Sequence, residues 1–342
     1  MTKKGAIVKD YCKAHTGLQD LTLAKKIYSE NKNIFNSVEN ARELVRYYRG
    51  HRGNSDRAKI KDKELFKPLT HDTRKKPEPI NTGAKVLILD IETAPIRAYV
   101  WGVWNENIHM NAIQSDYFIL TWAAKWLFED KVYSGKLNPN EVSNQDDHRI
   151  MMGIWRLLNE ADIVIAHNAE KFDIPKLNSR FIINGIEPPL PYQVIDTLKH
   201  IRRKFSFTHN KLDYVNKILK LTRKSETNGF ELWEKCMKGD REALNKMQEY
   251  NINDVKILED LYLVIRHWIT PHPNMGLFIL DNKQSRCACC GSEKLKDTGK
   301  KYYTSSNAFA LLKCDSCGSN NRKRLGELKI NDKRYLLISS AK

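Results

Sequence analysis

The chain has 342 residues, long enough for two or three folded units, and its hydrophobic fraction of 41% can supply a core. Its formal net charge of +17 favours a polyanionic partner such as nucleic acid. No apolar run approaches the roughly 18 to 20 residues of a membrane span, and no signal peptide is visible, so we expect a cytoplasmic protein without membrane contact.

The first fifty residues show three segments in which apolar residues recur at helical spacing. The segments cover residues 7–12, 23–28 and 38–48, and helix caps are expected at Thr22 for the second and at Asn36 or Ser37 for the third. The third segment carries Arg42, Arg46 and Arg49 on its outer face. Three short helices with an arginine stripe resemble a helix-turn-helix domain, which predicts a nucleic-acid-binding module over residues 1–52 with these arginines as substrate contacts. A small helical bundle with a solvated basic face is the alternative.

Residues 53–82 contain many Lys and Arg and three prolines, which indicates a basic linker. Basic residues outnumber acidic ones by 19 to 10 over residues 1–80 and by 14 to 5 over residues 283–342. The middle of the chain is near neutral, with 25 basic against 26 acidic residues. This distribution predicts that the flanks attract a polyanion, although a merely solvated charged surface would show the same excess.

Residues 83–272 change to an alternation of strands and helices, which is typical of an α/β fold. The nearly continuous apolar run at 85–91 predicts a central strand that is covered on both faces. Further strands are expected at 117–122, 132–137, 162–166 and 192–195, and helices at 150–158, 174–184 and 247–268.

Acidic residues occur at three places in this α/β region. Asp90 and Glu92 are two apart on the first strand, so their side chains share a face and can share a divalent ion. Asp173 lies between a buried strand and a helix, and Tyr250 and Asp254 lie one turn apart on the long helix. Each acid alone has an ordinary explanation as a strand-end acid, a helix-cap acid or a surface acid.

Together, these motifs resemble those of the DEDD or DnaQ-like exonucleases, whose fold is an RNase H-like mixed five-stranded sheet flanked by helices. Asp90 and Glu92 match the first motif of that family, Asp173 the second and Asp254 the third. Tyr250 matches the tyrosine subtype, because the histidine subtype would have His where this chain has Glu249. The overall similarity is to exonucleases found in bacteriophage genomes.

The resemblance implies a 3′-to-5′ exonuclease in which the four acids hold two Mg²⁺ or Mn²⁺ ions and Tyr250 orients the attacking water. By the same analogy, the terminal nucleotide contacts Ile91, Thr93 and Asn168, and Phe172 supports the pocket wall. Asp196 matches a further family position with a structural role. A basic group with two aromatic residues is expected either to follow a single strand or to form a solvated loop: Lys199, Arg202, Arg203, Lys204, Phe205 and Phe207.

Five of the seven cysteines fall within residues 287–317. Cys287 with Cys290, and Cys314 with Cys317, form two Cys-x-x-Cys pairs, each followed by glycine, and this pattern resembles a zinc ribbon over residues 283–342. Disulfides or an iron–sulfur cluster are the alternatives, and Cys289 is a surplus candidate ligand. The basic and aromatic residues around the cysteines favour a surface that faces nucleic acid, while protein contacts are the alternative use of such a ribbon.

These motifs lead us to expect an enzyme that releases nucleoside 5′-monophosphates from single-stranded 3′ ends, with DNA favoured, and that works with replication or repair proteins. An exoribonuclease fits the same residues, because ribose and deoxyribose differ in one hydroxyl. A catalytically inactive nucleic-acid-binding regulator is the alternative of another class. The intact acid set argues against it.

Overall fold

The structure is a computed structural model that describes residues 3–49, 83–104, 107–221, 229–279, 284–304 and 307–325. It contains two compact units, residues 1–70 and 71–342, which are described separately. The linker expected at 53–82 lies outside the described residues. None of the helices in the described ranges combines the length and the apolar character that crossing a bilayer requires.

The first unit contains three helices, as the sequence predicts: α1 (Lys3–Ala14), α2 (Asp20–Glu30) and α3 (Val38–Tyr48). Ser37 caps α3 by accepting a hydrogen bond from the backbone N–H of Asn40 at 3.1 Å, which confirms one of the two expected caps. Helix α2 begins two residues before Thr22 because Asp20 occupies the first turn, where the helix dipole favours an acid. The buried side chains come from all three helices: Val8, Leu23, Ala24, Ile27, Phe35, Ala41 and Val45.

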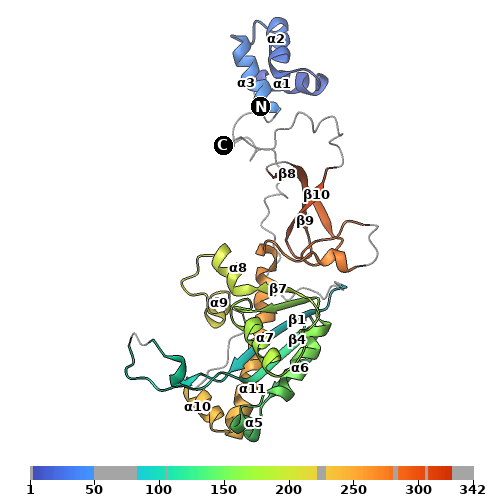
Figure 1. The fold of residues 1–342 in the computed structure, drawn as a ribbon. Coiled ribbons are helices and arrows are strands. Elements are labelled where there is room, and N and C mark those ends of the chain that lie inside the picture. Colours follow the sequence, from blue (N-terminus) through green and yellow to red (C-terminus); the bar gives the residue numbers. More distant parts are fainter. Residues whose placement is uncertain are drawn as a thin grey trace, which may run out of the picture. The chain divides into compact units, whose positions relative to one another are not determined.

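A mixed five-stranded sheet forms the centre of the second unit, as the sequence predicts (Figure 1). Its strands lie in the order β5 (Val132–Lys136), β4 (Ile119–Trp126), β1 (Val86–Thr93), β6 (Ile163–Ala166) and β7 (Gln193–Asp196). Strand β1 pairs antiparallel with β4 and parallel with β6. The apolar β1 is therefore central, with two strands on each side.

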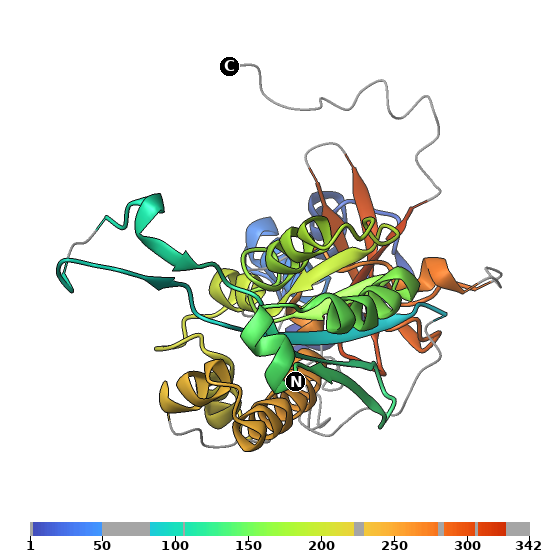
Figure 2. The same ribbon diagram turned by 60° about the horizontal axis from the view of Figure 1, so that its bottom comes forward.

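Helices cover both faces of the sheet (Figures 1 and 2). They are α5 (Pro139–Asn144), α6 (His148–Glu160), α7 (Asp173–Ile183), α8 (Thr197–Lys204), α9 (Leu212–Ile218), α10 (Glu231–Met237) and α11 (Arg241–Ile265). Leu87 and Leu89 of β1 pack on the side of α6 and α7. Val86 and Ile88 pack on the side of α8, α9 and the C-terminal half of α11. Because strand side chains alternate, Asp90 and Glu92 continue the row that faces α11.

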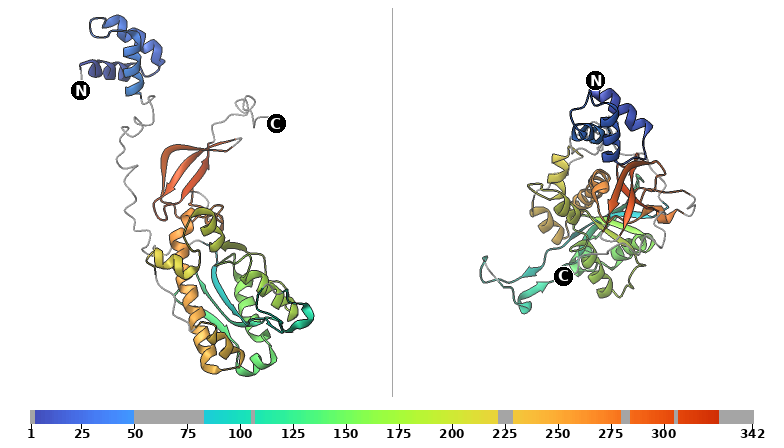
Figure 3. Two further views of the ribbon diagram at one scale, coloured as in Figure 1. Left: turned by 90° about the vertical axis from the view of Figure 1, so that its left-hand side faces the viewer. Right: turned by 90° about the horizontal axis from the view of Figure 1, so that it is seen from above.

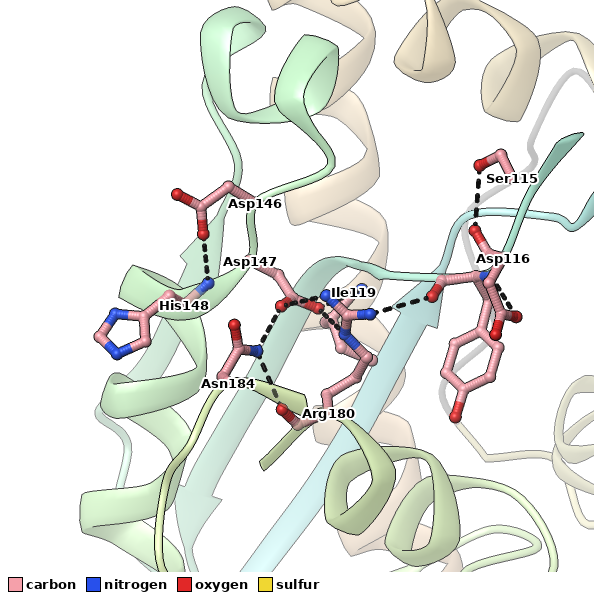
Figure 4. A network of polar contacts seen from close by, with 9 residues as sticks. Ser115, Asp116, Ile119, Asp146, Asp147, His148, Arg180 and Asn184 are labelled. Carbon is pink, nitrogen blue, oxygen red and sulfur yellow. Dashed lines mark hydrogen bonds and ion pairs between the residues drawn. The ribbon is translucent and has the colours of Figure 1, made fainter. Parts of the chain in front are cut away.

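A buried ion pair fixes α7 against the sheet and α6 (Figure 4). The guanidinium of Arg180 donates to both carboxylate oxygens of Asp147 at 2.7 and 2.8 Å. Asp147 also accepts from the backbone N–H of Ile119 at 2.9 Å and from the side-chain amide of Asn184 at 2.7 Å. Asp147 is fully buried, so each of these donors replaces water that the carboxylate has lost.

A hairpin that the sequence did not predict extends away from the sheet after β1 (Figures 1 and 2). It pairs β2 (Arg97–Ala98) with β3 (Ile113–Ser115), and the short helix η1 (Met110–Ala112) precedes β3. Residues 96–113 include nine of the 19 exposed large hydrophobic side chains in the described parts of the chain, among them Trp101 and Trp104.

The cysteine-rich segment forms a small three-stranded sheet in the order β10 (Asn320–Arg324), β9 (Ala308–Cys314) and β8 (Leu295–Tyr303). It follows α11, η2 (Arg266–Trp268) and η3 (Met275–Phe278) along the chain, and it lies beyond the end of α11 in Figure 3. The backbone N–H of Met275 donates to the carbonyl of Ala288 at 2.8 Å, which joins this sheet to the helical segment before it.

Candidate active site

Three of the predicted acids converge where β1 faces α11. Asp90, Glu92 and Asp254 each offer a carboxylate oxygen, and these oxygens lie within 4.8 Å of one another. Asp254 is only 3% exposed. Placing three carboxylates this close is unfavourable without a compensating cation, and hard oxygen donors are the ligands that Mg²⁺ and Mn²⁺ prefer. The residues therefore fit a divalent metal site.

Asp173 lies beside these three acids, as the first residue of α7. Its carboxyl is 1% exposed, and its pKa is raised well above the usual range by burial and by the negative charge of Asp90. Hydrogen bonds from the backbone N–H groups of Asp173 itself and of Ile91 act in the opposite direction. A cation near Asp90 would favour the ionised form of Asp173.

Two uncharged side chains that the sequence did not single out hold Asp90 in place. The side-chain amide of Asn251 on α11 donates to Oδ2 of Asp90 at 2.5 Å. Asn251 in turn accepts from the hydroxyl of Thr121 on β4 at 3.2 Å. We call this chain of hydrogen bonds from Thr121 through Asn251 to Asp90 the relay. Both Asn251 and Thr121 are fully buried, so the relay is shielded from water.

Tyr250 lies one helical turn before Asp254, as its spacing predicts. Its ring packs edge-on against Trp233 of α10, with ring centroids 6.4 Å apart and planes at 78°. Only 9% of Tyr250 is exposed. Helix α10 therefore fixes the direction of the phenol.

Asp196 orders the loop before α7. Its carboxylate accepts from the backbone N–H groups of Asn168, Glu170 and Lys199 at 3.1 to 3.2 Å. Asn168 has a φ of 80°, a left-handed conformation that Asn tolerates better than most residues. His167 adds a second tie, because its ring nitrogens contact the hydroxyl of Thr197 at 2.9 Å and the carbonyl of Asn210 at 3.0 Å.

The four acids and Tyr250 line one cleft of about 880 Å³. Three predicted nucleotide contacts also line it, namely Ile91, Asn168 and Phe172. Three basic or titratable side chains complete the wall from the side of α8 and α9: Arg202, His209 and Lys211. Of these, only Arg202 belonged to the predicted basic group.

Thr93, a fourth predicted nucleotide contact, is not among the residues that line this cleft. The register of β1 against β4 shifts between Glu92 and Thr93, and this irregularity changes the direction of the strand end. The family analogy therefore does not carry over to Thr93, which follows the irregularity.

The arginines of α3 differ from one another. Arg46 is exposed, and Arg42 forms an ion pair with Glu39, with 3.4 Å between its guanidinium nitrogen and the carboxylate oxygen. Arg49 departs from the expected outer position, because its guanidinium donates to the carbonyls of His15 and Leu18 and to Asp20. Its side chain is 15% exposed, so it connects the three helices to one another.

The four predicted cysteines form a second cluster. The sulfur atoms of Cys287, Cys290, Cys314 and Cys317 lie within 4.8 Å of one another, and all seven cysteines are free thiols. Gly291 and Gly318 have φ of 76° and 75°, as the tight turn after each cysteine pair requires. Four thiolates at this spacing fit a tetrahedral Zn²⁺ ion.

Cys289 lies outside that group of four. It is 4% exposed, and its charge acts on Tyr262 and Arg266 at the end of α11. Burial lowers the pKa of Arg266, but the neighbouring Cys289 and Tyr262 raise it, and the net effect is a raised pKa. Cys290 and Cys317 of the group of four also lie near Arg266, so this buried guanidinium would offset part of the negative charge of the thiolates.

A comparison with protein-family models agrees with this fold. A family model described as the RNase_H superfamily matches residues 125–266. A search of curated proteins finds no match. Among solved structures, the family B DNA polymerase from the hyperthermophilic archaeon Pyrobaculum calidifontis is 18% identical, with a TM-score of 0.41 over 54% of this chain and 25% of that chain.

The matched segment contains Asp173, Tyr250 and Asp254, and it begins after the strand that carries Asp90 and Glu92. It includes β5, β6, β7 and the helices from α5 to α11, whereas β1 and nearly all of β4 precede it. The match over residues 125–266, together with the mixed five-stranded sheet, identifies an RNase H-like fold, which supports nuclease activity.

Proposed function

We propose that the chain is a metal-dependent 3′-to-5′ exonuclease that releases nucleoside 5′-monophosphates from nucleic-acid ends, with DNA as the favoured substrate. One observation carries the proposal. Five residues from three distant segments of the sequence line the same cleft: Asp90, Glu92, Asp173, Tyr250 and Asp254. Both the order of these residues and their chemical types match the tyrosine subtype of the DEDD exonucleases.

The four acids are the proposed ligands of two Mg²⁺ or Mn²⁺ ions. When bound, such ions supply an activated water and stabilise the departing 3′-oxygen. Asp90, Glu92 and Asp254 offer the closest oxygens, and Asp173 adds a buried carboxyl beside Asp90. The mutual repulsion of these groups is the physical reason that a cation belongs here.

The remaining wall residues bind and orient the substrate. Tyr250 orients the attacking water through its hydroxyl, because Trp233 fixes its ring. Ile91 and Asn168 contact the terminal nucleotide, and Phe172 forms part of the pocket wall. Arg202 and Lys211 bring positive charge to a phosphate in the cleft.

The flanking parts are proposed to bind nucleic acid as separate modules. Residues 1–52 form a helix-turn-helix-like domain that contacts phosphates through Arg46 and Arg42, joined by the linker at 53–82 to an exonuclease domain at 83–272. Residues 283–342 form a zinc ribbon with one structural Zn²⁺ held by the two cysteine pairs. The exposed position of Arg46 supports the first assignment, and the clustered sulfur atoms support the second.

The test is digestion of 5′-labelled single-stranded DNA and RNA of the same sequence in Mn²⁺ or Mg²⁺, with Asp254→Asn and EDTA as controls. We expect a metal-dependent ladder that starts at the 3′ end, is stronger on DNA, and is absent in the variant. A stronger ladder on RNA would make the protein an exoribonuclease. Binding of both nucleic acids without any cleavage would support the inactive regulator instead.

A further inference from the structure

We infer that a single-stranded substrate reaches the cleft along one face of the cysteine-bearing sheet and then across Trp268 and Phe205. The inference rests on the proposed function and names the path of its substrate. Three observations support it: the composition of one sheet face, a stacked arginine on that face, and a series of ring contacts from η2 to the end of α8, the helix that carries Arg202 of the cleft wall.

The strand register defines this face, because directly paired residues of adjacent strands project to the same side. Tyr302 pairs with Phe309, Phe309 with Arg324, and Leu311 with Arg322. Lys313 pairs with Lys296 and with Asn320. We call these residues the Tyr302 face, and it is made up of Lys296, Tyr302, Phe309, Leu311, Lys313, Asn320, Arg322 and Arg324. The face has four cations, of which Lys296 pairs with Asp315 at 3.2 Å just beyond the end of β9, and the remaining three complement a phosphate backbone.

An arginine is stacked on the two aromatic rings of this face. The guanidinium carbon of Arg322 lies 5.7 Å from the ring centroid of Tyr302 and 5.3 Å from that of Phe309. The two ring centroids are 6.5 Å apart. Flat rings and guanidinium planes stack on unpaired bases, whereas a duplex hides its base faces in its own stack. The composition therefore favours a single strand over a duplex.

The small sheet adjoins the segment that follows α11, because the backbone N–H of Met275 donates to the carbonyl of Ala288 at 2.8 Å. His267 and Trp268 lie in η2, at the end of α11. The His267 ring is 5.7 Å from that of Trp268, and Trp268 is 53% exposed. Phosphates that follow the sheet would therefore meet an exposed indole next.

The path continues from Trp268 to α8. Phe205 lies at the end of α8, and its ring centroid is 5.5 Å from that of Trp268 and 5.3 Å from that of Phe207. Arg203 donates to the carbonyl of Thr270 at 3.4 Å, which ties α8 to the segment after η2. Figures 1 and 3 both place α8 beside the end of α11, with the small sheet beyond it. Helix α8 also carries Arg202, which lines the cleft.

The opposite face of the small sheet provides a matched control. Tyr303 and Lys323 are exposed neighbours of Tyr302 and Arg322 in the sequence, but their pairing partners Ala308 and Ala310 place them on the other side. The double variants Tyr302→Ala/Arg322→Ala and Tyr303→Ala/Lys323→Ala thus remove the same kinds of group and the same charge. Trp268→Ala tests the middle of the path.

The full-length variants are assayed on a 30-nucleotide single-stranded DNA and on the nitrophenyl ester of thymidine 5′-monophosphate, which occupies the cleft alone. We expect the ratio of kcat/KM on the long substrate to kcat/KM on the ester to fall about tenfold for each aromatic ring removed. The Tyr303→Ala/Lys323→Ala variant should keep the wild-type ratio. Zinc content and melting temperature show whether each variant is folded.

A second readout is binding of the 30-nucleotide DNA at several salt concentrations in the Asp254→Asn background. Loss of Arg322 should reduce the slope of log Kd against log salt by about 0.7, while loss of Lys323 leaves the slope unchanged. Equal effects of the two double variants on this binding would overturn the path. If the wild type cleaves neither substrate, the proposed function fails, and the binding comparison still decides whether the path exists.

Discussion

The buried relay from Thr121 through Asn251 to Asp90 makes a strong prediction about a residue that touches no substrate. Asn251→Ala removes the donor that holds Oδ2 of Asp90 at 2.5 Å and leaves a cavity one helical turn from Asp254. A hydrogen bond to a charged group contributes about 1.5 to 3 kcal/mol, which corresponds to roughly a 10- to 150-fold change. Loss of a residue that orients a metal ligand typically costs about 10- to 100-fold in metal affinity or activity.

We therefore expect Asn251→Ala to lower kcat on single-stranded DNA by about 10- to 100-fold and to raise the Mg²⁺ concentration needed for half-maximal rate. Thr121→Val should cost about fivefold, because it removes one neutral hydrogen bond from the same relay. Since Thr121 acts through Asn251, the double variant should be no worse than Asn251→Ala alone.

Gln248→Ala is the matched control for these variants. Gln248 also lies on α11 and donates from its side chain to the sheet, to the hydroxyl of Ser134 at 2.8 Å, without contacting Asp90. Steady-state rates at several Mg²⁺ concentrations measure all four variants. If Asn251→Ala leaves both kcat and the Mg²⁺ dependence at wild-type values, or behaves like Gln248→Ala, the positioning role of the relay is wrong.

Three further predictions concern other buried charges and the N-terminal module. Asp173→Asn should abolish cleavage yet raise the melting temperature of the metal-free protein at pH 7, because folding raises the pKa of this carboxyl and so costs stability wherever the unfolded chain ionises it. The gain should shrink as the pH falls through the unfolded-state pKa of about 3.9 and disappear near pH 2, where the carboxyl is protonated in both states; a gain at all pH values would contradict this account. Arg180→Met should lower the free energy of unfolding, measured in urea, by about 3 to 5 kcal/mol, because it leaves the fully buried Asp147 without its cation. A decrease of less than about 1 kcal/mol would show that water reaches the carboxylate. Arg46→Ala should weaken binding to duplex DNA and reduce the slope of log Kd against log salt by about 0.9, because Arg46 is exposed. Arg49→Ala should instead lower the thermal stability of the first unit, because Arg49 bonds to His15. Equal salt slopes for the two variants would remove Arg46 from the interface.

Strong apolar patterns made most of the fold predictable. The run at 85–91 predicted a central strand, and β1 occupies the centre of the sheet. Helix α11 starts six residues earlier than expected, because Asp240 caps it by accepting from the backbone N–H of Ala243 at 2.9 Å. The hairpin after β1 was missed because its strands have only two and three residues, too few to show a period.

The sequence pointed to the acids for a reason that does not apply to the residues that support them. Each acid alone has an ordinary explanation, and only the order and spacing of all of them together resemble the motifs of a known family. Asn251 and Thr121 carry no charge, and a buried amide or hydroxyl fits many ordinary helix and strand positions. Only the pairing of β1 with β4 and the packing of α11 bring these two side chains to Asp90.

Helix α11 connects the cleft to the cysteine-bearing sheet. Its first half carries Tyr250, Asn251 and Asp254, and its last turns carry Tyr262, whose hydroxyl contacts His272 at 3.0 Å. The buried Arg266 follows directly and lies among the charges of the cysteine cluster. A straight helix is about 1.5 Å long per residue, so the twelve-residue step from Asp254 to Arg266 spans roughly 18 Å. One continuous segment thus carries cleft residues at one end and residues beside the cysteine cluster at the other, which is a condition that the proposed path of a single strand requires.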